Sequence, residues 1–66
     1  MFTNDNTNGM YSDDLLDEMN AALTQMLDDA GGDDWRREQN EKNFSDRIMP
    51  IAEEGMSAAD IIAAAK

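Results

Sequence analysis

Apolar residues recur with a helical period in three stretches of the chain. The clearest stretch is residues 13–30, where they repeat every three or four positions and form one broad stripe: Leu15, Leu16, Met19, Ala22, Leu23, Met26, Leu27 and Ala30. Ser12 is placed to cap the start of this helix, and Gly31 and Gly32 supply its end. The pattern predicts an amphipathic helix over residues 13–30.

A second helix is predicted over residues 34–54, capped by Asp33 or Asp34. Its first half is polar on every side, and apolar spacing returns only in its second half. Pro50 falls inside this stretch and lacks the backbone N–H that a helix interior needs. We therefore expect a kink or a break near residues 47–50.

The last predicted helix covers residues 58–66. Ser57 and Asp60 have the spacing of a capping box, in which each side chain accepts a hydrogen bond from the other residue's backbone N–H. Lys66 places a positive charge at the helix C-terminus, where the helix dipole favours it. No stretch shows the pattern of a strand, so no sheet is expected.

Residues 1–11 have no helical period and are rich in Asn, Thr, Asp and Gly. This composition predicts a flexible or turn-forming arm ahead of a single helical domain over residues 12–66. The expected fold class is all-α: a small bundle or open arrangement of three helices, the second kinked or broken near Pro50, with an irregular N-terminal arm.

The inventory of side chains argues against catalysis. The chain has 66 residues with no Cys and no His, and no Gly-rich loop precedes a helix. A chain this short builds a small core and has little material for a desolvated cleft, in which carboxylates act as acids or bases. We expect no enzyme, no catalytic residue and no cofactor.

Metal binding and membrane insertion are also disfavoured. Residues 4–9 carry oxygen donors at alternate positions, as in the first half of a calcium loop, but Asn4 stands at the first ligand position and Leu15 at the last. A solvated turn is the preferred interpretation, and no metal site is predicted. No signal-peptide pattern is present, and no apolar run approaches the roughly 20 residues that span a bilayer. A cytoplasmic location is expected.

Negative charge is concentrated in the first half of the chain. The net charge is −10, and residues 1–34 hold nine acidic residues with no Lys or Arg. A phosphate backbone or an anionic membrane would be repelled by such a surface, so neither is an expected partner. The candidate partner-binding residues form an acidic face along the first helix and the turn after it: Asp14, Asp17, Glu18, Asp28, Asp29, Asp33 and Asp34.

A row of carboxylates can imitate nucleic-acid phosphates, because Lys and Arg do not distinguish the two groups by charge. The expected partner is a protein with a basic surface, such as a nucleic-acid-binding enzyme or complex. The competing interpretation is a solvated face, or pairing of the acids with the chain's own bases, Arg36, Arg37, Lys42 and Arg47.

The apolar stripe offers a second candidate surface. Its members Leu16, Met19, Leu23 and Met26 fit a heptad seam, and Trp35 follows the acidic turn. A core role is favoured for the stripe and, by a smaller margin, for Trp35. The alternative is an interface, either with a larger complex or in a homodimer through the first helix.

Small, acidic, largely helical chains without cysteine are similar in general composition to bacteriophage accessory proteins that bind and inhibit a host enzyme or defence complex. This resemblance implies a non-enzymatic inhibitor or modulator that acts in the cytoplasm of a bacterial host, with its acidic face on a basic surface. The alternative is a small structural or assembly component of a virion or larger complex, docking through the Leu/Met stripe.

Overall fold

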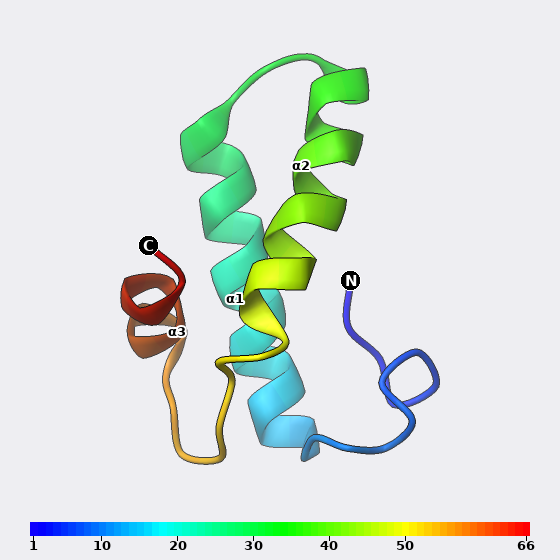
Figure 1. Ribbon diagram of the computed structural model, residues 1–66, viewed down its shortest axis with the longest axis vertical. Helices are drawn as coiled ribbons and strands as arrows, with labels where there is room; N and C mark the ends of the chain where they lie inside the picture. Colours follow the sequence, from blue (N-terminus) through cyan, green and yellow to red (C-terminus); the bar gives the residue numbers. More distant parts are fainter.

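The computed structural model describes all 66 residues and contains three helices and no strand. Helix α1 spans Asp13–Ala30, α2 spans Asp34–Ile48 and α3 spans Ala58–Ala65. Figure 1 shows α1 and α2 as an antiparallel hairpin along the long axis, with the short α3 seen nearly end-on beside α1. The predicted all-α, three-helix fold is confirmed.

Each helix begins where a local side chain satisfies backbone N–H groups that have no partner within the helix. Ser12 Oγ accepts from the N–H of Leu15 at 3.1 Å. Asp33 caps α2, where its Oδ1 accepts a hydrogen bond from the N–H of Arg36 at 2.9 Å. Ser57 and Asp60 form the predicted capping box, with bonds of 3.2 and 3.1 Å. These contacts explain why the three predicted starts agree with the structure.

The break expected near residues 47–50 is confirmed, because α2 ends at Ile48, but the expected resumption of the helix beyond it is not. The helix stops at Ile48 and does not resume after Pro50, so the predicted continuation to residue 54 is wrong. The N–H groups of Ile51 and Ala52 both donate to the carbonyl of Ile48, at 3.1 and 3.0 Å, and turn the chain away. Because Pro50 cannot donate a helical hydrogen bond, this turn satisfies the end of α2 and redirects the chain toward α3.

The core is the apolar stripe of α1, covered by side chains from the other segments. Nine hydrophobic residues are buried, and six of them lie on α1: Leu15, Leu16, Met19, Ala22, Leu23 and Leu27. Phe2, Ile48 and Ile61 supply the rest, one each from the N-terminal segment, α2 and α3. Nine partly buried hydrophobic residues, among them Phe44, Ile51 and Ile62, pack around this buried cluster.

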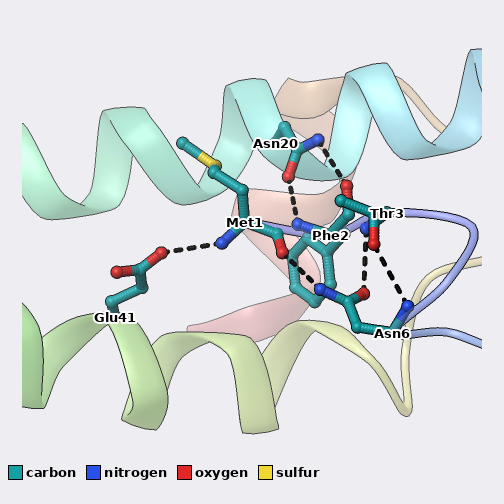
Figure 2. A network of polar contacts seen from close by, with 6 residues as sticks. All are labelled: Met1, Phe2, Thr3, Asn6, Asn20 and Glu41. Carbon is teal, nitrogen blue, oxygen red and sulfur yellow. Dashed lines mark hydrogen bonds and ion pairs between the residues drawn. The ribbon is translucent and has the colours of Figure 1, made fainter.

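The N-terminal segment is held between α1 and α2 (Figure 2). Asn20 of α1 accepts from the Phe2 N–H through Oδ1 at 2.7 Å and donates from Nδ2 to the Phe2 carbonyl at 3.0 Å. The amino group of Met1 lies 2.8 Å from Oε1 of Glu41 on α2. Both backbone groups of Phe2 are thus satisfied by one side chain while its ring is buried in the core.

The rest of residues 1–11 is irregular, as expected, and is tied down by polar contacts. Thr3 and Asn6 exchange side-chain-to-backbone hydrogen bonds of 2.9 and 3.1 Å. Asn4 Nδ2 donates to Asp13 at the start of α1, at 3.1 Å. Tyr11 Oη donates to the carbonyl of Met49, just after α2, at 3.0 Å. The N-terminal segment is therefore tied to α1 at Asp13 and Asn20 and to α2 at Glu41.

A further tie joins the start of α1 to the loop before α3. Glu54 Oε1 accepts from the Ser12 N–H at 3.0 Å, and Oε2 accepts from the Ser12 hydroxyl at 2.7 Å. These two hydrogen bonds, the hydroxyl one foremost, lower the pKa of the Glu54 carboxyl below its ordinary value. The ionised carboxylate is therefore favoured in the folded chain.

Replacing Asn20 by Ala leaves the Phe2 N–H and carbonyl without their partner in a partly buried position. We expect a loss of about 1–3 kcal/mol in the free energy of unfolding. Gln25→Ala is the control, because Gln25 is exposed on the same helix and its side chain makes no hydrogen bond within the chain. Urea unfolding of both variants tests this, and equal stabilities would contradict the role of Asn20.

The Glu54–Ser12 contact makes stability depend on pH. Since the folded pKa of Glu54 is lowered, the contact stabilises the chain above the ordinary glutamate pKa of about 4.3 and is lost as the pH falls through the lowered value. Thermal unfolding of the wild type and Glu54→Gln should differ most near neutral pH, with the gap closing in acid. A gap that stays constant down to acidic pH would contradict this prediction.

Candidate functional site

The candidate acidic face is built by the helical period of α1. Asp14, Asp17, Asp28 and Asp29 are exposed on the side of α1 away from the core, and Glu18 is half-buried at its border. Asp33 and Asp34 follow at the exposed turn into α2. The structure thus places most of these carboxylates in solvent, where a partner can reach them.

The acidic face is divided into two groups, which the sequence pattern did not reveal. Between Glu18 and Asp28, the positions that continue the face are taken by exposed Ala21 and Gln25. The gap corresponds to about 15 Å along the helix axis at 1.5 Å per residue. A partner would therefore meet two separate negative patches instead of one continuous row.

The first patch lies at the start of α1. Asp14, Asp17, Glu18 and Glu54 line a shallow depression together with Ser12, Leu15, Gly55 and Met56. Two of these carboxylates also serve the fold. Glu18 Oε2 accepts from the N–H of Ala58 at 3.0 Å, where the positive end of the α3 dipole favours an anion. Glu54 is held by Ser12 through the two hydrogen bonds described above.

Sequence reasoning missed the role of Glu18, because its partner lies forty residues away in the chain. A residue that caps a helix from a different element leaves no local spacing signal. Sequence reasoning also missed Glu54, which had no place in the predicted face although it lines the same depression.

The second patch surrounds the tip of the α1–α2 hairpin. Asp28 is paired with Arg37 of α2, with its Oδ1 3.0 Å from Nη2. Asp33 caps α2 through its side chain. Asp29 and Asp34 are exposed and make no side-chain hydrogen bond or ion pair within the chain.

The chain's own cations neutralise little of this charge. Fifteen acidic residues are present, yet only two ion pairs form, and one of them uses the amino group of Met1. Arg36, Lys42 and Arg47 pair with no carboxylate, and the Arg47 guanidinium lies over the Phe44 ring instead, at 5.9 Å. Within the acidic face, only Asp28 pairs with one of these bases, Arg37.

The proposed apolar interface is mostly inaccessible. Leu16, Met19 and Leu23 are buried in the core of the single chain, and Met26 packs half-buried against it. Because these residues already cover Phe2, Ile48 and Ile61, docking or dimerisation through the Leu/Met stripe would require the core to open. The interface hypothesis for these residues does not agree with the structure.

Trp35 is the opposite case. The preference for a core role is wrong, because the side chain is 65% exposed. It sits in the first turn of α2, within a stretch whose residues are all exposed. Of the candidate apolar contacts, Trp35 is the one whose side chain is exposed to solvent.

No group of three or more acidic side chains lies close enough to hold a metal ion. In the calcium-loop-like stretch, Asn4 and Asn6 instead donate to Asp13 and to the Met1 carbonyl, at 3.1 and 2.8 Å. No helix combines the length and the apolar content needed to cross a membrane.

Comparison with known proteins adds no family to this picture. No family model matches the chain, and no curated protein or solved structure matches it.

Proposed function

We propose that the chain is a small non-enzymatic inhibitor or modulator whose acidic face binds a basic, nucleic-acid-binding surface of another protein in place of phosphates. The observation that supports this most directly is the excess of exposed carboxylates that the fold leaves unpaired. Asp14, Asp17, Asp29 and Asp34 are exposed and take part in no ion pair.

The chemistry of such a contact is that of charge-assisted hydrogen bonds. Arg and Lys side chains that cradle phosphates donate to carboxylate oxygens in the same way. The excess negative charge also steers a basic partner during encounter and raises the association rate at low salt. Carboxylates held on a rigid helix lose little conformational freedom on binding, which favours affinity.

The two patches suggest how the contact is divided. Asp14 and Asp17 lie near the start of α1, whereas Asp29 lies near its end and Asp34 follows in α2. A basic groove that accommodates a nucleic acid offers cations over a comparable length, because phosphates recur along the whole backbone. The place of action that we propose is the cytoplasm of a bacterial host, in line with the compositional resemblance to bacteriophage accessory proteins.

The acidic face is tested by amide substitutions that remove charge and keep shape. In a triple variant, Asp14, Asp17 and Asp29 become Asn. The matched control changes Asp5, Asp46 and Glu53 to their amides, which alters the net charge equally at exposed sites outside the face. We expect the face variant to bind roughly threefold to a hundredfold more weakly, since three exposed ion pairs contribute about 0.2–1 kcal/mol each. The control should bind like the wild type.

The measurement is affinity capture from a bacterial lysate at low salt, elution at high salt, and mass spectrometry, followed by titration of the captured protein. A nucleic-acid-binding protein that is retained by the wild type and the control, and released by salt, supports the proposal. Equal weakening by both triple variants, or a partner that resists high salt, would contradict it.

A further inference from the structure

The tip of the α1–α2 hairpin projects beyond the core. Every residue from Asp28 to Gln39 is exposed, so this stretch contributes no side chain to the buried cluster. Figure 1 shows the tip at the end of the molecule away from α3. The only tryptophan of the chain lies in this stretch, with 65% of its surface exposed. An exposed Trp adds little to folding, so the indole is available for contact with another molecule.

The neighbours of Trp35 are mainly acidic. Asp34, Arg37, Glu38 and Glu41 line a shallow depression together with the indole. Arg37 is already paired with Asp28, and Glu41 with the amino group of Met1. The carboxylates of Asp34 and Glu38 remain beside the indole without an ion-pair partner in the chain.

No cation of the chain covers the indole either. Arg36, the next residue, lays its aliphatic stem against Gly32, so that a Cβ added to Gly32 would come within 2.8 Å of Arg36 Cδ. The single cation–π contact within the chain is Arg47 over Phe44. The face of Trp35 is thus unoccupied by the protein's own positive groups.

We propose that the hairpin tip binds an arginine side chain of the basic partner, with its guanidinium stacked on Trp35 and its N–H groups donating to Asp34 or Glu38. Trp is the strongest cation–π partner among the aromatic side chains, and a planar guanidinium both stacks and bonds to carboxylates in a fork. A lysine ammonium forms the charge contact without the stacking. Exposed Trp residues are also enriched among the side chains that dominate protein interfaces.

This proposal rests on the proposed function, because it assumes a basic partner. Trp35 is the anchor, and an arginine side chain of the partner is the cationic group. Charge complementarity selects the occupant: an acidic tip with an aromatic face disfavours an anionic partner and favours a cationic one. The tip then supplies the aromatic contact, while the exposed carboxylates of both patches supply the general attraction.

The test uses the full chain and two synthetic probes, nona-arginine and nona-lysine. Since Trp35 is the only tryptophan, its fluorescence reports on the tip directly. At low salt we expect nona-arginine to change the Trp35 emission in a saturable way and to bind more tightly than nona-lysine. Trp35→Ala should weaken nona-arginine binding by about fivefold or more in calorimetry, and Trp35→Phe should weaken it less.

Met10→Ala is the matched control, because Met10 is a comparably exposed apolar residue, 74% accessible, in the N-terminal segment. It should bind nona-arginine as the wild type does. Circular dichroism is used to check that the variants are folded, which is expected because the substituted side chains are exposed.

Two outcomes overturn the proposal separately from the proposed function. If nona-arginine binds but leaves the Trp35 emission and the Trp35→Ala affinity unchanged, the tip is not the anchor, while binding through the acidic face stands. If the Trp35 emission changes with protein concentration alone, the tip is a self-association surface. If neither peptide binds at low salt, both the tip and the proposed acidic-face function are contradicted.

Discussion

Burial of the α1 stripe is the constraint on which the rest of the molecule depends. α2 and α3 each contribute one fully buried hydrophobic side chain, Ile48 and Ile61, and the N-terminal segment contributes Phe2. Burying one such side chain stabilises a fold by roughly 1.5–3 kcal/mol, which is similar to the cost of ordering one or two residues. Partly buried side chains such as Phe44, Ile51 and Ile62 add to this apolar contact, and polar contacts through Asn20 and Glu54 fix the N-terminal segment and the loop before α3.

The acidity of the chain consequently has two roles. Some carboxylates hold the fold: Glu18 caps α3 from a distance, Asp33 caps α2, and Glu54 fastens the loop before α3 to Ser12. Others, such as Asp17 and Asp29, contribute nothing visible to the fold and add to the mutual repulsion of a surface with net charge −10. The proposed role in binding would account for this second group, because a basic partner would relieve the repulsion.

The hydrophobic core and the proposed contact surface at the hairpin tip lie in different parts of the molecule. The core lies where α1, α2, α3 and the N-terminal segment meet, whereas the exposed stretch 28–39 extends away from it and carries Trp35. Asp34, Trp35 and Glu38 are exposed and make no ion pair, so substitutions there are expected to change stability little. Asp33, which caps α2, and Asp28, which pairs with Arg37, also serve the fold. The groups proposed to bind arginine can therefore be altered one at a time without loss of the fold.

Local patterns in the chain were sufficient for the fold class and for most helix ends. Caps such as Ser12 and the Ser57–Asp60 box act within one turn of backbone, so their effects are readable from spacing. The sequence predicted that Pro50 interrupts the helix, but not whether the helix bends or ends there. The missing N–H excludes a regular helix, but whether the helix bends or ends depends on how the following residues pack.

The burial of individual side chains was decided by contacts between distant segments. Phe2 and Trp35 are both aromatic residues near polar neighbours, yet Phe2 is buried and Trp35 is exposed. Asn20, eighteen residues from Phe2, holds the Phe2 backbone beside the core through two hydrogen bonds. Trp35 lies in the exposed stretch 28–39, which adds no side chain to the buried core. The helical period of α1 specified which of its acidic side chains share the face away from the core. Only the packed chain determined which of those carboxylates are engaged in the fold and which remain free to meet a partner.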